Sequence, residues 1–195
     1  DAAALTPALK KIKAAGISHI TTGNIGGIAL SKQLGFTIHG EYGLNITNSL
    51  ALGEYAALGV QDTVVSYELS MARAKALGDL MPYGILAYGR LPLMVTRNCP
   101  VKLSGCKNCR QYGVLKDRRG ETFEVRCTQR QYSEIFNGKA LYLADKREEL
   151  EGFSFLLLYF TGETPQECDA VLEDYTTAAT KRENITRGLY YRNVK

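Results

Sequence analysis

Four of the five cysteines in this chain of 195 residues lie within one stretch of 29 residues, and thiols are its most distinctive chemical groups. Six residues separate Cys99 from Cys106, two separate Cys106 from Cys109, and seventeen separate Cys109 from Cys127. A C-x-x-C pair followed by a long loop and another cysteine is typical of a four-thiolate metal or cluster site. Disulfides are the alternative, and the four cysteines allow three pairings. The spacing favours the metal or cluster.

The positive charge of the chain gathers around these cysteines. Residues 90–130 hold ten Lys and Arg and three Asp and Glu, a balance of +7, whereas the whole chain has a net charge of +4. Basic groups favour the thiolate form of cysteine, and they attract a phosphate backbone. Residues 90–130 are therefore a candidate surface for binding a phosphate backbone, with a solvated basic surface as the alternative.

The chain before the cysteines repeats one pattern, in which a helix ends at glycine and a short strand follows. Alternation of this kind predicts parallel strands joined by right-handed helical crossovers. Four such units are present, and a closed (β/α) barrel needs about twice as many. We expect either a small open sheet or half of a TIM-like barrel, and the half barrel is favoured because the chain starts on a helix rather than a strand. Its missing N-terminal half would be a partner, and the exposed sheet edge could form a homodimer. The four expected helices run from Thr6-Pro7 to Gly16, from near 26 to Gly35, from after Asn48-Ser49 to Gly59, and from near 69 to Gly78. The strands that follow them are expected at 17–22, 36–39, 63–66 and 83–88.

The pattern changes after the cysteines. A hairpin is expected with strands at 114–116 and 122–127, so that Cys127 shares a face with Phe123 and Val125. Residues 141–144 and 153–160 read as strands, the second one buried. A capping box at Thr164 opens a helix that should bury Cys168, Val171, Leu172 and Tyr175. The predicted class is α/β, with a half barrel at 1–98, a four-Cys and hairpin segment at 99–130, and an α+β region at 131–195 that packs back on the barrel.

Polar residues follow the expected parallel strands, at the ends where such folds bind ligands. The catalytic candidates are His39, Glu68 and Arg90; the substrate-binding candidates are Asn24, Asn45, Asn48 and Arg97; the metal candidates are Cys99, Cys106, Cys109 and Cys127. Helix caps or turns are the alternative for Asn24 and Asn48, and a structural turn histidine is the alternative for His39.

Several classes of protein find no support in the sequence. There is no G-x-S-x-G or H-E-x-x-H motif, and the apolar run 153–160 is far shorter than the roughly 20 residues of a membrane span. No signal peptide is recognisable. The chain begins at Asp1 rather than Met, which suggests a piece of a longer protein. We expect a cytoplasmic protein without a membrane partner.

Several of these motifs together resemble one family. The sequence from about Gly23 to Arg192 resembles the second half of the core region of the collagenase-like peptidases, peptidase family U-32. The motifs are Gly40–Ser49 (GEYGLNITNS), Ser66–Leu69 (SYEL), Tyr88–Met94 (YGRLPLM), Thr96–Val101 (TRNCPV) with Gly105-Cys106-x-x-Cys109, and Leu115-x-Asp117-Arg118-x-Gly120.

The resemblance implies a barrel-like α/β catalytic core with the four cysteines at one site. The family name implies proteolysis, whereas other members look like RNA-modifying enzymes that hydroxylate a pyrimidine and carry an iron–sulfur cluster on the cysteines. Carried over by position, His39, Asn45, Glu68 and Arg90 would line the substrate cleft.

Three functions follow as hypotheses: a cluster-bearing RNA-hydroxylating enzyme, a collagenase-like peptidase, and a structural zinc module without activity of its own. We expect zinc in the isolated piece or an iron–sulfur cluster in the full protein. We also expect the piece to be inactive alone, because the first half of the barrel is missing.

Overall fold

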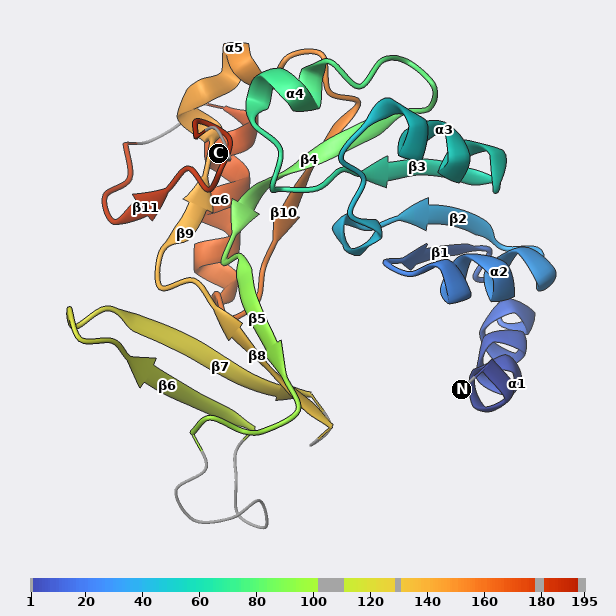
Figure 1. Ribbon diagram of the computed structural model, residues 1–195, viewed down its shortest axis with the longest axis horizontal. Helices are drawn as coiled ribbons and strands as arrows, with labels where there is room; N and C mark the ends of the chain where they lie inside the picture. Colours follow the sequence, from blue (N-terminus) through green and yellow to red (C-terminus); the bar gives the residue numbers. More distant parts are fainter. Residues whose placement is uncertain (1, 102–110, 129–130, 178–180, 193–195) are drawn as a thin grey trace. The chain divides into compact units, whose positions relative to one another are not determined.

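The computed structural model describes residues 2–101, 111–128, 131–177 and 181–192 (Figure 1). It divides into two compact units, one formed by Asp1–Ala87, Lys146–Leu158 and Gly188–Lys195, and the other by Tyr88–Asp145 and Tyr159–Arg187. This division groups residues that pack together in space and combines separate stretches of the chain. It does not test the predicted segment boundaries at residues 98 and 130, which stay a prediction. Within the described ranges, every helix is too short or too polar to cross a membrane.

Unit 1 holds a parallel sheet with its helical crossovers. Parallel pairing joins β1 to β2, β2 to β3, and β3 to β4. The α/β class with parallel strands is therefore confirmed. The elements are α1 (Ala2–Ala14), β1 (His19–Thr22), α2 (Ile25–Gln33), β2 (Thr37–Gly40), the 3₁₀ helix η1 (Tyr42–Leu44), α3 (Ser49–Ala57), β3 (Val60–Val64), α4 (Met71–Lys75), most of β4 (Tyr83–Gly89), α5 (Arg147–Leu150) and most of β10 (Phe155–Tyr159).

Glycine and asparagine set the limits of these elements as the sequence indicates. The four glycines that follow α1, α2, α3 and α4 all have positive φ, between 72° and 96°. A positive φ is energetically unfavourable for residues that carry a Cβ but not for glycine, which is why the helices end at these glycines. The predicted start of the first helix is wrong. Helix α1 begins at Ala2, so Thr6-Pro7 lies inside the helix and does not cap it. Alanines at 2–4 have the highest helix propensity, and they extend the helix ahead of the proline.

The two faces of β1 and β2 differ in character. A Cβ at Gly27 of α2 would overlap the side chain of Thr22, so Thr22 faces the helix layer. Alternation along the strands then places Ile20 and Ile38 on the helix side, and His19 and His39 on the opposite side. Ile38 is 2% exposed, whereas His19 is exposed. The face away from α2 is therefore polar.

Unit 2 contains a four-stranded antiparallel sheet in the order β5-β8-β7-β6. The end of β4 pairs antiparallel with β9, and β9 pairs parallel with β11. The elements are β5 (Pro92–Thr96), β6 (Tyr112–Lys116), β7 (Thr122–Thr128), β8 (Tyr132–Phe136), β9 (Ala140–Tyr142), the 3₁₀ helix η2 (Ala144–Lys146), α6 (Pro165–Thr176) and β11 (Ile185–Thr186).

The β6–β7 hairpin confirms the prediction for this segment. The carboxylate of Asp117 accepts hydrogen bonds from the backbone amides of Arg119 and Glu121, which closes the turn. Phe123, Val125 and Cys127 alternate along β7 and share a face, as expected. Strands β5 and β8, which complete the sheet, have no counterpart in the predicted elements.

Two expectations about burial are wrong. The residues of β10 are half-buried, not buried. In α6 the capping box at Thr164 is present and Val171 is buried, but Leu172 is 46% exposed, and Cys168 and Tyr175 are only half-buried. Asp174 is buried instead, where its carboxylate accepts a hydrogen bond of 2.6 Å from Nε of Arg182. A buried carboxylate needs such a partner, because desolvating an unpaired charge is costly.

Strand β4 leaves no room for a side chain at Gly84. A Cβ there would overlap the backbone carbonyl oxygen of Phe155, which belongs to β10. We expect Gly84→Ala to lower the free energy of unfolding by about 1–3 kcal/mol, because a backbone atom cannot rotate away. Urea unfolding followed by circular dichroism measures this. Gly26→Ala is the control, because its Cβ would meet only Asn24 Oδ1 at 3.4 Å; equal losses in both variants would contradict the prediction.

Candidate functional site

Asn24 and Asn48 are helix N-caps in unit 1. Oδ1 of Asn24 accepts a hydrogen bond of 2.7 Å from the backbone amide of Gly27, and Oδ1 of Asn48 accepts one of 2.9 Å from that of Ala51. Each bond satisfies one of the amides that a helix leaves unpaired at its start. The sequence indicated this alternative, and a substrate-binding role for these side chains stays a prediction.

Asn45 and Glu68 come together through Ser66. Asn45 follows η1 with φ of 50°, and its Oδ1 accepts a hydrogen bond of 2.6 Å from the Ser66 hydroxyl. That hydroxyl in turn accepts a hydrogen bond of 3.3 Å from the backbone amide of Glu68, whose side chain is exposed. Burial, and then the charge of Glu68, raise the pKa of the neighbouring Tyr67. The loops after β2 and β3 therefore form one hydrogen-bonded polar cluster.

His39 lies between two partners on neighbouring strands. Its Nδ1 is 2.9 Å from both carboxylate oxygens of Asp62 on β3, and its Nε2 is 2.9 Å from Nδ1 of His19 on β1. Side chains of His39 and Asp62 are 28% and 26% exposed. The sequence singled out His39 but not its partners Asp62 and His19. The pairing of His39 with Asp62 depends on a register shift beside Gln61, which no sequence pattern reveals.

The cysteines of the described residues are Cys99, Cys127 and Cys168, all half-buried free thiols. Cys106 and Cys109 lie outside the described residues. The backbone amide of Cys127 donates a hydrogen bond of 2.8 Å to the carbonyl oxygen of Gln111. A Cβ at Gly113 would lie 2.6 Å from Cγ2 of Val101. The chain therefore leaves at Val101 and returns at Gln111 beside the same two strands, β6 and β7.

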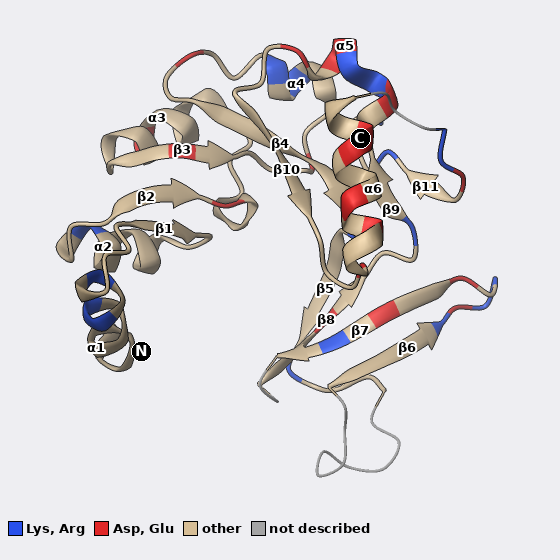
Figure 2. Ribbon diagram, turned by 180° about the vertical axis from the view of Figure 1, so that it is seen from behind, with Lys and Arg blue, Asp and Glu red and all other residues tan. Residues whose placement is uncertain are grey.

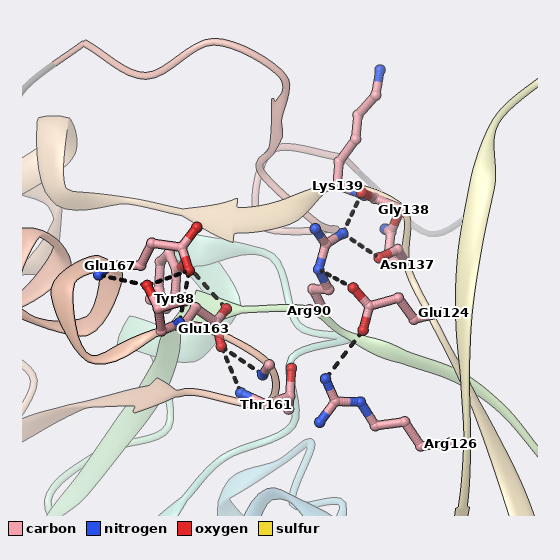
Figure 3. Close-up of polar contacts among 12 residues, drawn as sticks. Tyr88, Arg90, Glu124, Arg126, Asn137, Gly138, Lys139, Thr161, Glu163 and Glu167 are labelled. Atoms are coloured by element: carbon pink, nitrogen blue, oxygen red, sulfur yellow. Dashed lines mark hydrogen bonds and ion pairs between the residues drawn. The ribbon is translucent and has the colours of Figure 1, made fainter. Parts of the chain in front are cut away.

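Arg90 is held in unit 2 by a group of polar contacts (Figure 3). Its guanidinium donates to the carbonyl oxygens of Asn137 and Gly138, and its Nε is 3.4 Å from Glu124. The same carboxylate accepts a hydrogen bond of 3.1 Å from Arg126. Glu124 thus contacts two guanidinium groups, and Arg90 joins the start of β5 to the loop after β8. Arg97, which follows β5, is exposed.

Tyr88 and Glu163 form a second polar group in unit 2 (Figure 3). The Tyr88 hydroxyl donates a hydrogen bond of 3.2 Å to Glu163, whose other oxygen accepts from the backbone amides of Thr161 (2.7 Å) and Gly162 (2.9 Å). Burial, with the charge of Glu163 next, raises the pKa of Tyr88 to about 12. Burial opposes ionisation of Glu163, but the amide and Tyr88 hydrogen bonds together lower its pKa.

A cavity of about 150 Å³ lies beside this group. Three carboxylates, two guanidinium groups and one phenol line it, from Glu124, Glu163, Glu167, Arg90, Arg182 and Tyr88. Both charge signs are present, so the cavity suits a small polar molecule rather than an apolar one. Sequence reasoning included Arg90 but missed the other five residues, which lie on four separate segments.

The predicted site residues thus fall into two groups. Unit 1 holds Asn24, His39, Asn45, Asn48 and Glu68, and unit 2 holds Arg90, Arg97, Cys99 and Cys127. Within the described ranges, no group of three or more His, Cys, Asp or Glu side chains could hold a metal ion. Cys106 and Cys109 lie outside those ranges, so the four-thiolate site stays a prediction.

The fold and the site define an α/β protein with a parallel sheet, polar residues on the loops that follow β1, β2 and β3, and free thiols beside an antiparallel sheet. Comparison of the chain with protein-family models, with curated proteins and with solved structures found no match.

The Glu163 contacts predict a dependence of stability on pH. Because the folded pKa of Glu163 is lowered, its contribution is present above the unfolded value of 4.5 and is lost as the pH falls through the folded pKa. We expect Glu163→Gln to lower the free energy of unfolding by about 1–2 kcal/mol at pH 7, because an amide nitrogen replaces one acceptor oxygen. Urea unfolding at pH 7 and at pH 3 measures the difference, which should shrink at the lower pH. A difference that stays equal at both values would contradict this.

Proposed function

We propose that this chain is part of a U-32-like, cluster- or metal-binding enzyme that modifies RNA, with Cys99, Cys106, Cys109 and Cys127 as the ligands. One observation carries the proposal: the chain leaves Val101 and returns at Gln111 beside the strand that carries Cys127. Cys99 is two residues before Val101, and Cys109 is two residues before Gln111. A residue spans at most about 3.6 Å of chain, so this anchoring favours a shared thiolate site.

The occupant is proposed to be an iron–sulfur cluster in the full protein and zinc in the isolated piece, since four thiolates suit either one. Free thiols at Cys99, Cys127 and Cys168 fit a reducing compartment, which supports a cytoplasmic location.

The parallel sheet of unit 1 is proposed to be half of a TIM-like barrel. Four parallel strands with helical crossovers and Asn-capped loops at the carboxyl ends support this reading. Strand β1 is at the edge of the sheet, where backbone groups can pair with a further strand. The missing N-terminal half of the barrel would occupy that edge, or a second copy would in a homodimer.

The RNA-binding surface is proposed to lie on residues 90–130. Arg97 is exposed, and so are Lys116, Arg118 and Arg119. Figure 2 shows basic residues, with acidic ones between them, at the tip of the β6–β7 hairpin. Tyr112, 52% exposed on β6, adds an aromatic ring to this basic surface. Exposed cations and exposed aromatic rings along one groove or surface are the usual means of holding single-stranded nucleic acid. Arg90 and Arg126 contribute less, because both contact Glu124.

Metal analysis tests the thiolate site. We expect anaerobically purified protein to contain either iron with sulfide or zinc, and Cys99→Ser and Cys127→Ser each to lose most of it, because a closed four-ligand site needs all its ligands. Elemental analysis and the visible absorbance spectrum measure this.

Cys168→Ser is the matched control, because Cys168 lies on α6 outside the cysteine cluster of the sequence. It should keep the full metal content. Wild-type protein without iron or zinc would exclude both occupants. Collagen cleavage retained by Cys99→Ser would favour the peptidase hypothesis over the RNA-modifying one.

The hairpin tip is expected to contribute to RNA affinity. Replacing Lys116, Arg118 and Arg119 together by Gln should weaken binding to unfractionated transfer RNA. It should also reduce the steepness of the plot of log binding constant against log salt concentration by roughly 2, because each of the three phosphate contacts contributes about 0.7 to that slope on single strands. Filter binding at several salt concentrations measures both effects. The control replaces Lys10, Lys11 and Arg73, which are exposed in unit 1, by Gln. An equal loss in the control would indicate a nonspecific effect of net charge.

A further inference from the structure

Three ionisable side chains on adjacent strands form a continuous hydrogen-bonded chain in unit 1. Asp62 on β3 contacts Nδ1 of His39 on β2, and Nε2 of His39 contacts Nδ1 of His19 on β1. All three lie on the face of the sheet opposite α2, and the outermost member, His19, is exposed. These histidines are the only two in the chain.

The two imidazole rings meet edge to edge. Their planes differ by 18°, and their centroids are 5.2 Å apart with the two nitrogens 2.9 Å apart. Rings stacked face to face would keep these nitrogens at van der Waals separation, which exceeds 2.9 Å. The nitrogens therefore point at one another, and the geometry is that of an N–H···N hydrogen bond. A metal bound by both rings would need the lone pairs to converge on a third point instead.

When Asp62 is ionised and both imidazoles are neutral, this geometry assigns a position to each proton. An ionised carboxylate only accepts hydrogen bonds, so Asp62 requires a proton on Nδ1 of His39. Nε2 of a neutral His39 is then an acceptor, which requires a proton on Nδ1 of His19. Nε2 of His19 is left as an unprotonated nitrogen at the exposed end of the chain.

We propose that His19, His39 and Asp62 form a general-base site that accepts a proton from an O–H group of water or an alcohol bound on this face. The O–H bond breaks and the proton joins Nε2 of His19, while the electron pair stays on the oxygen. The Nδ1 proton of His19 passes to Nε2 of His39, and the resulting imidazolium is stabilised by the Asp62 carboxylate.

The neighbouring side chains suit such a ligand. Thr37 pairs with His19 in the register of the sheet, and Thr21 pairs with His39, so hydroxyl groups alternate with the imidazoles. In this assignment His19 touches the substrate, whereas His39 and Asp62 are positioning residues. The site does not depend on the cysteines or on the proposed RNA-modifying function, because each of its atoms belongs to unit 1.

Nitrogen NMR of the histidine side chains tests the assignment directly. With ¹⁵N-labelled protein above pH 8, we expect both histidines to carry the proton on Nδ1, although free histidine favours Nε2. His19→Gln assigns the two sets of signals, because one histidine then remains. Wild-type His19 protonated on Nε2 would overturn the proposal without any further variant.

Replacing Asp62 should reverse the direction of the hydrogen bond between His39 and His19. In Asp62→Leu, Nδ1 of His39 loses its acceptor, so His39 can donate from Nε2 and His19 then carries its proton on Nε2. Acylation of His19 by diethyl pyrocarbonate, which attacks unprotonated ring nitrogens, should slow by roughly tenfold, as expected for the loss of one hydrogen bond to a charged acceptor.

Gln61→Leu is the matched control, because it adds the same side chain at the adjacent exposed position of β3. It should leave both the NMR pattern and the acylation rate unchanged. Asp62→Asn serves if Asp62→Leu does not fold, and it should slow acylation by a smaller factor. Equal acylation rates in wild type and the Asp62 variant would overturn the proposal.

Discussion

The close approach of β10 to β4 is the constraint on which the rest of the structure depends. In unit 1 the carbonyl oxygen of Phe155 occupies the space that a side chain at Gly84 would need, and in unit 2 that of Tyr159 does the same at Gly89. All seven residues of β4 are buried. Both glycines are therefore steric requirements, since any Cβ would push two backbones apart. Strand β4 also presents Tyr88 to Glu163 and leads directly to Arg90, so its position determines the polar group of unit 2.

The sequence predicts elements well where one residue type decides the local geometry. Gly35 and Gly59 end helices because only glycine takes a positive φ at no cost, and Asn24 and Asn48 begin them because their oxygens reach the first free amides. It fails where the decision is made by distant residues. Strand β5 forms by pairing with β8, and β8 forms by pairing with both β5 and β7; neither stands out as a strand from its own residues.

The candidate site shows the same contrast between features set by local sequence and features set by distant residues. Cys127 was placed correctly beside Phe123 and Val125, because alternation is a local property of a strand. Asp62 and Glu163 were missed, because their side-chain partners His39 and Tyr88 lie 23 and 75 positions away in the sequence. Their roles depend on register and on loop packing, and no spacing in the chain encodes either one. The sequence singled out His39 itself, but not its acidic partner on β3.

The polar face of β1, β2 and β3 bears on the proposed barrel. Parallel sheets are usually covered on both faces by apolar residues, and the interior of a (β/α) barrel is normally filled with branched apolar side chains. Here His19, His39 and Asp62 occupy that face and satisfy one another through hydrogen bonds. If these strands close into a barrel, this part of its interior would be polar and hydrogen-bonded. Such an arrangement costs less than burying unpaired charges, and it leaves a ring nitrogen of His19 for a polar ligand.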